Sequence, residues 1–231
     1  MTEELTKKIT PESVLKRYEG IKEPYKVECL GKEWWICPGV MDPTKSYVSQ
    51  MFAEAVRELT PRKGLVLDIG CGCGIDAIFA AEKIKDVFAY DINPWAVMCT
   101  KLNSNLSKSY GKVYTGASDL FNEVIDHKVN AIYFNLPFGF PIKPYSHIET
   151  PKGGIQHAIF DEDYELMKRF LKEAKDHLST EGFILTTAGT ISGSDYVLEN
   201  HAQKNGYIKK IIREEEKDDE IFRIYELRKR E

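Results

Sequence analysis

From about residue 63 onward, short β-rich runs alternate with segments of helical periodicity. This alternation is typical of βαβ units, which build a mostly parallel sheet covered by helices. No helical segment separates the last two runs, so these should form an antiparallel hairpin. We therefore predict an α/β fold with a seven-stranded, doubly wound, mostly parallel sheet and an antiparallel last strand. The predicted strands are residues 64–69, 86–90, 112–115, 130–134, 183–187, 207–212 and 221–227.

Helical patterns occupy most of the connections between these strands. Residues 161–178 place apolar side chains on one face, and Pro94 suits the first turn of another helix. Ahead of the sheet, residues 1–45 form a small N-terminal extension with a helix and a short hairpin, which is a candidate for substrate recognition. The main domain is expected to span residues 46–231.

Composition excludes several classes of protein. The chain has 32 basic and 36 acidic residues, which argues against a generally polycationic nucleic-acid binder and leaves room for a local basic surface. The five cysteines lack the histidine pairing of a zinc site, so we expect reduced thiols and no metal. There is no apolar signal region, and no run approaches the roughly 20 apolar residues of a membrane span. We expect a cytoplasmic protein.

A glycine-rich turn follows the first predicted strand, with the pattern Asp68-x-Gly70-x-Gly72-x-Gly74. Glycines let the backbone approach a ligand closely. The dinucleotide fingerprint Gly-x-Gly-x-x-Gly fails here, because its last position would be Ile75. A carboxylate before the first glycine suits a ligand with an ammonium and a sulfonium group better than a pyrophosphate. The alternative is that Asp68 only caps the turn.

Two further polar positions follow predicted strands. Asp91 ends the second strand, where it can accept hydrogen bonds from both ribose hydroxyls of a nucleoside. Asn135-Leu136-Pro137-Phe138 follows the fourth. The Asn135 amide oxygen and the Leu136 carbonyl can each accept a hydrogen from one NH2 group, and the Phe138 ring can stack on its plane. The alternative is a turn in which Asn135 only caps backbone.

Over about residues 40–231, these motifs and Ser118-Asp119-Leu120 after the third strand resemble the successive motifs of class I amino-methyltransferases. The resemblance implies S-adenosylmethionine as cofactor. It implies that Asp119 accepts from the adenine amino group and that the Leu120 amide contacts the ring. The implied cofactor-binding residues are Asp68, Gly70, Cys71, Gly72, Gly74, Asp91, Ile92, Asp119, Leu120 and Asn135. The implied catalytic residues are Asn135, Leu136, Pro137 and Phe138.

The sequence departs from the usual family signature at Leu136, where a second proline is expected. Leucine does not fix φ, although the following Pro137 still favours an extended Leu136. The loop 39–46 resembles the one that such enzymes lay over the methionine end of the cofactor. The long loop 139–160 is predicted to be a substrate-binding lid, with Phe140 and Tyr145 joining Phe138 in substrate contacts.

The motifs leave the substrate open. We favour the exocyclic amine of an RNA base, adenine N6 or guanine N2 in rRNA or tRNA, turned out of its stack. DNA is not expected. The alternative is the side-chain amide of a glutamine in a translation release factor, because Gly153-Gly154 resembles those enzymes, although residues 1–62 do not resemble their helical bundle. A small-molecule amine, or a non-catalytic cofactor-binding scaffold, remain further alternatives.

Overall fold

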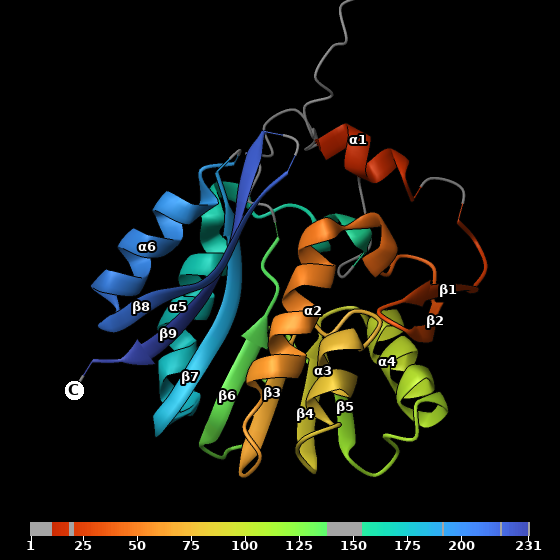
Figure 1. The fold of residues 1–231 in the computed structure, drawn as a ribbon, viewed down its shortest axis with the longest axis horizontal. Helices are drawn as coiled ribbons and strands as arrows, with labels where there is room; N and C mark the ends of the chain where they lie inside the picture. The colour runs from red at the N-terminus through yellow and green to blue at the C-terminus, as the bar shows by residue number, and fades with distance from the viewer. Residues whose placement is uncertain (1–10, 19–20, 138–153, 191, 218, 231) are drawn as a thin grey trace, which may run out of the picture.

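Seven strands form one sheet in the computed structural model, within the described residues 11–18, 21–137, 154–190, 192–217 and 219–230. Their order across the sheet is β5-β4-β3-β6-β7-β9-β8 (Figure 1). The first five are parallel neighbours, and β9 is antiparallel to both β7 and β8. The predicted fold class is confirmed. The strands are β3 Leu65–Ile69, β4 Asp86–Asp91, β5 Val113–Ala117, β6 Val129–Phe134, β7 Leu178–Gly189, β8 Tyr207–Lys217 and β9 Glu220–Lys229.

Helices cover both faces of the sheet because strand side chains alternate between two apolar clusters. Leu67 packs with Phe170 in the cluster beneath α5 and α6, whereas its neighbour Val66 packs with Phe52 beneath α2 and α3. The remaining helix of the main domain, α4, packs against α3 and the N-terminal hairpin. The helices are α2 Tyr47–Leu59, α3 Ile75–Ala80, α4 Pro94–Leu106, α5 Glu165–His177 and α6 Ser194–Lys204.

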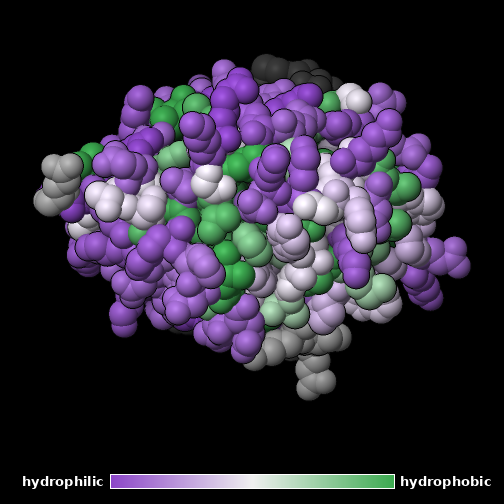
Figure 2. All heavy atoms as spheres, turned by 90° about the horizontal axis from the view of Figure 1, so that it is seen from below, coloured by the Kyte–Doolittle hydropathy of each residue, from purple (hydrophilic) through white to green (hydrophobic). Residues whose placement is uncertain are grey.

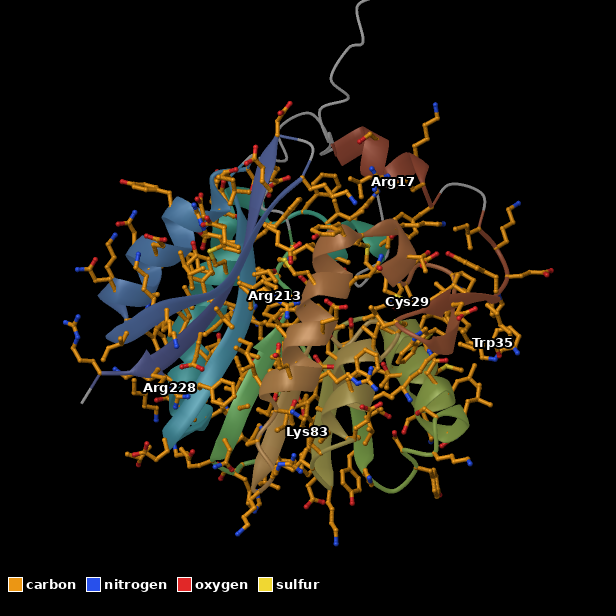
Figure 3. All side chains as sticks on the ribbon, in the orientation of Figure 1. Arg17, Cys29, Trp35, Lys83, Arg213 and Arg228 are labelled. Atoms are coloured by element: carbon orange, nitrogen blue, oxygen red, sulfur yellow. The ribbon has the colours of Figure 1, made fainter. Side chains whose placement is uncertain are left out.

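The last hairpin is longer than its sequence suggests. The acidic residues 214–220 lie between the predicted strands 207–212 and 221–227, and their charge predicts a solvated turn; in the structure, however, β8 runs to Lys217 and β9 begins at Glu220. Pairing with basic residues stabilises the acidic strand: Glu214 lies opposite Arg223 and accepts a hydrogen bond from it at 2.6 Å. On the same strand, Arg213 pairs with Glu54 and Glu58 of α2, which ties the hairpin to that helix (Figure 3).

The N-terminal part contains α1 Pro11–Lys16 and an antiparallel pair of strands, β1 Tyr25–Cys29 and β2 Lys32–Ile36. The pair is anchored by Trp34, which is 1% exposed and meets the Phe79 ring edge-on at 5.7 Å between centroids. The described N-terminal residues therefore form a helix and a hairpin. The domain boundary at residue 45 stays a prediction.

Hydrophilic side chains cover most of the face seen in Figure 2, with apolar side chains between them near its middle. Within the described residues, no helix combines the length and apolar character needed to cross a membrane. The same residues contain no cluster of three or more potential metal ligands.

Candidate functional site

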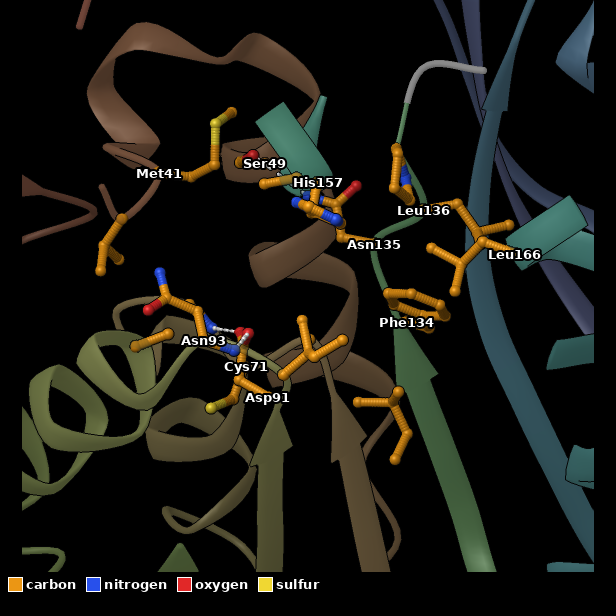
Figure 4. A pocket seen from close by; sticks show the side chains of 18 of the residues that line it. Met41, Ser49, Cys71, Asp91, Asn93, Phe134, Asn135, Leu136, His157 and Leu166 are labelled. Atoms are coloured by element: carbon orange, nitrogen blue, oxygen red, sulfur yellow. Dashed lines mark hydrogen bonds between the residues drawn. The ribbon is translucent and has the colours of Figure 1, made fainter. Parts of the chain in front are cut away.

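A cavity of about 460 Å³ opens at the carboxyl ends of β3, β4 and β6, a size typical of a small-molecule site (Figure 4). Open parallel sheets bind ligands at this edge, because the loops there diverge to opposite faces. The wall is built from the turn after β3, the loop 39–46, the start of α2, and residues 154–169. Segments far apart in the sequence thus meet at one pocket.

The glycine-rich turn forms one wall of this pocket. The backbone amides of Gly70 and Cys71 both donate to the carbonyl of Tyr90, at 2.7 and 3.1 Å, which holds the turn against the end of β4. Gly70 has φ +69, and a Cβ there would lie 2.8 Å from the Phe134 ring. Of the predicted cofactor-binding residues in this turn, Gly70, Cys71 and Gly72 line the pocket, whereas Gly74 is not among its lining residues.

Asp91 lies at the end of β4, at the pocket wall. Its Oδ2 accepts from the Gly72 amide at 3.0 Å and its Oδ1 accepts from the Asn93 amide at 2.8 Å (Figure 4). Burial raises the pKa of Asp91, and these amide hydrogen bonds oppose the shift. Each carboxylate oxygen keeps a further lone pair, so the group can still accept hydrogen bonds from hydroxyls of a ligand. Ile92 also lines the pocket.

Asp119 and Leu120 lie together at another part of the pocket wall. The Asp119 Oδ1 accepts a hydrogen bond from Arg169 Nη2 at 2.6 Å, an ion pair that the sequence did not indicate because 50 residues separate the partners. The hydrogen bond from Arg169 to this carboxylate raises the pKa of Arg169. Among the described residues, no hydrogen bond involves Asp119 Oδ2, which leaves this oxygen available to a ligand.

Asp68 lies outside the pocket lining and is 1% exposed. Its Oδ2 accepts from the Ala77 amide at 3.1 Å, so it holds the first turn of α3, which matches the capping alternative. A second acid, Asp76, does line the pocket. It comes just after the glycine turn. The sequence alone does not single it out, because acidic residues are common in the first turn of a helix.

Asn135 stands at the end of β6 with both ends of its amide held. Its Oδ1 accepts from the Thr187 hydroxyl at 2.9 Å, and its Nδ2 donates to Ser49 Oγ at 3.1 Å. Asn135, Leu136 and Pro137 share the pocket with the glycine turn. The predicted substrate contacts Phe138, Phe140 and Tyr145 lie outside the described residues.

Residues 42–147 match the family model described as "Methyltransferase small domain". The release factor glutamine methyltransferase of Aquifex aeolicus is 27% identical over 202 residues, 79% of this chain and 70% of that protein. A putative protein N5-glutamine methyltransferase of Methanocaldococcus jannaschii is 32% identical over 55% of this chain and 63% of that protein. A ribosomal protein L11 methyltransferase of Oceanobacillus iheyensis is 27% identical over 74% of this chain and 46% of that protein. The chain thus spans between about half and 70% of these relatives.

Solved structures share the fold at low identity. The Trm5b structure from Pyrococcus abyssi superposes with a TM-score of 0.63 at 19% identity, covering 91% of this chain and 56% of that one. The T. thermophilus 16S rRNA N2 G1207 methyltransferase, solved with AdoMet and guanosine, gives 0.62 at 18% identity, covering 90% of this chain and 50% of that one. These matches confirm the methyltransferase fold that the sequence predicts.

Proposed function

We propose that this chain is a class I S-adenosylmethionine-dependent methyltransferase and that it transfers a methyl group to a planar amino nitrogen held at Asn135. One observation carries the proposal: Asn135 and Leu136, at the end of β6, share a single pocket with the glycine-rich turn and Asp91. Groups suited to binding a nucleoside and groups suited to binding an NH2 therefore face the same space.

The residues present fit the cofactor. Asp91 would accept hydrogen bonds from the ribose hydroxyls, and the free oxygen of Asp119 would accept from the adenine amino group. A Cβ at Gly70 would lie 2.8 Å from the Phe134 ring, so a glycine at this position lets the turn pack against the end of β6 at the pocket wall. The bound cofactor supplies an electrophilic methyl group on a sulfonium.

The protein's own work is then to orient and shield the nucleophile. The second lone pair of Asn135 Oδ1 and the carbonyl of Leu136 would accept the two hydrogens of the target NH2. This aligns the nitrogen lone pair for in-line attack, and the buried Leu136 and Phe134 side chains exclude water from the site. The nitrogen becomes strongly acidic once it is methylated, so its proton is lost to water as the product leaves the site and no strong general base is required.

We propose the exocyclic amine of an RNA base as the target. The loop 39–46 lines the pocket and has basic groups beside it: its own Lys45 lies 4.9 Å over the Tyr18 ring, and Arg17, labelled in Figure 3, donates to the Lys45 carbonyl at 2.9 Å. Lys16 and Arg17 are exposed. Such groups beside a pocket mouth are suited to the phosphates that flank an extracted base.

One observation favours a glutamine side chain instead. The Aquifex aeolicus relative, a release factor glutamine methyltransferase, aligns with 79% of this chain. The planar side-chain amide presents the same NH2 as a base, so the Asn135 geometry suits both. Against this candidate, the described N-terminal residues form a short helix and a hairpin, not a helical bundle.

Incubation of the protein with methyl-labelled cofactor and with separate RNA and release-factor preparations distinguishes the candidates. We expect nuclease-sensitive label that declines steeply with added salt, because phosphate contacts release counterions. The double variant Lys16→Gln/Arg17→Gln should weaken RNA labelling and make its decline with added salt less steep, because fewer phosphate contacts remain, and it should leave cofactor affinity unchanged. Label that resists nuclease and is indifferent to salt would establish the glutamine candidate. If the protein binds the cofactor but labels neither preparation, the result would favour the alternative of a non-catalytic cofactor-binding scaffold.

A further inference from the structure

Asp76 is a buried acid in the pocket wall, and it has no role in the mechanism proposed above. It lies in the first turn of α3 and is 8% exposed. Its Oδ1 is fully buried and has no hydrogen-bond partner among the described residues. A native structure rarely leaves such an atom unpaired, so each case requires an explanation.

The other buried acids around this pocket are satisfied by the protein itself. Asp161 accepts from the amides of Leu166 and Met167 at 2.7 and 2.8 Å. Asp91 accepts from two backbone amides, as described above. Burial of a carboxylate without donors costs several kcal/mol. Asp76 therefore differs from its neighbours in lacking a donor, not in being buried.

The protein offers no cation to Asp76 within its described residues. Arg169 is the single Arg or Lys among the described lining residues, and it is engaged by Asp119 and Glu173. A second acid, Asp68, lies close enough to Asp76 for the two carboxyls to interact electrostatically. Two acids without a counter-charge favour a cationic ligand group at this point of the wall.

We propose that the Asp76 carboxylate receives the α-ammonium group at the amino-acid end of the cofactor. This assignment rests on the proposed function, and it transfers to Asp76 the role that the sequence suggested for Asp68. Asp76 lines the pocket directly after the glycine turn, together with Ser46 and Ser49 at the start of α2. In the proposed function Asp91 and Asp119 would hold the nucleoside end, so Asp76, the further acid of the wall beside the glycine turn, would meet the amino-acid end of the molecule.

Two ligands that differ at this end test the assignment by calorimetry. S-adenosylhomocysteine carries the ammonium, and 5′-methylthioadenosine has the same nucleoside and sulfur without it. Asp76→Asn should weaken S-adenosylhomocysteine binding by roughly tenfold to a hundredfold, the range for a hydrogen bond between charged groups, and leave methylthioadenosine binding unchanged. The substitution is nearly isosteric and removes a buried charge, so we expect a folded protein. Asp76→Ser serves as a second variant and should show the same selectivity.

Asp161→Asn is the matched control, because it neutralises another buried acid of the pocket wall whose partners are protein amides. Any effect of that change should be equal for both ligands. Equal weakening of both ligands by Asp76→Asn, or no effect on either, would overturn the assignment and make Asp76 a structural residue. If the unaltered protein binds neither ligand, the proposed function itself fails and the assignment falls with it.

Discussion

The hydroxyl of Thr187 donates a hydrogen bond to Oδ1 of Asn135 across 2.9 Å, joining the neighbouring strands β7 and β6 at the pocket. Thr187 is 3% exposed, so this bond is sheltered from water. At the opposite end of the amide, Ser49 accepts from Nδ2. With both ends held, the amide cannot rotate, and the free lone pair of its oxygen keeps one direction for the substrate amine.

Replacement Thr187→Val should therefore lower turnover and leave cofactor affinity unchanged. Valine keeps the shape of threonine and removes the donor, at a cost of about 1–1.5 kcal/mol, or roughly tenfold in rate. Thr187→Ser restores the hydroxyl and should recover most of the turnover. Equal activity of the valine and serine variants would show that the hydroxyl does not position Asn135.

Asn135→Ala should abolish methyl transfer while S-adenosylhomocysteine affinity stays nearly intact. Asn135 would act on the target amine as the transition state forms, so the loss of activity should appear as a lower kcat. Steady-state kinetics and calorimetry on the same variant separate the two effects. Parallel loss of binding and transfer would make Asn135 a residue of the cofactor site or of the fold.

Asp91→Ala should weaken S-adenosylhomocysteine binding by roughly 1.5–3 kcal/mol, the scale for hydrogen bonds to a charged group. Asp86 lies at the other end of the same strand, outside the pocket lining, and supplies the control Asp86→Ala. Calorimetry should detect a change only in the first variant. Unchanged affinity after Asp91→Ala would remove that residue from the proposed ribose contact.

Gly74→Ala should destabilise the fold more than Gly111→Ala. Both glycines have φ near +80, where alanine costs about 1 kcal/mol or more. At Gly74, a Cβ would also lie 2.8 Å from Thr100 Cγ2 and 3.0 Å from its Cα, whereas nothing lies within 4 Å at Gly111. Urea unfolding measures both variants, and equal losses would contradict the close packing of the turn on α4.

The contribution of Asp76 to the stability of the ligand-free protein should fall as pH rises from about 4 to about 7. Burial raises the pKa of Asp76 from the ordinary 3.8 to about 7, so in this window the folded state binds a proton that the unfolded state has released. This contribution is fully present below the pKa of Asp76 in the unfolded state, and it disappears as pH rises through the pKa of Asp76 in the folded state. Its slope is at most about 1.4 kcal/mol per pH unit for one proton.

Asp76→Asn removes this titration, so its unfolding free energy should depend less on pH across the same window. Urea unfolding of the two proteins at about pH 5 and about pH 7.5 measures the difference. Parallel pH profiles would show that Asp76 ionises normally in the folded protein.

The sequence by itself determined the architecture of this protein, because the architecture depends on local periodicity. Alternating strand and helix patterns indicated the parallel sheet, and the missing helix before the last strand indicated the antiparallel end. The glycine turn, Asp91 and Asn135 could be located as well, since each directly follows an apolar run. The end of a parallel strand is where such a sheet binds ligands.

Only the tertiary structure decided which side chains meet. Asn135 finds partners 52 and 86 residues away, and Asp119 pairs with an arginine 50 residues on. Such pairs depend on the order of strands across the sheet and on helix packing, neither of which leaves a periodic signal. Helix packing also decides which of the two acids, Asp68 or Asp76, lies in the pocket wall. The two acids are eight positions apart and both read as residues of one turn, but the packing of α3 directs one toward backbone amides and leaves the other in the pocket wall without a donor.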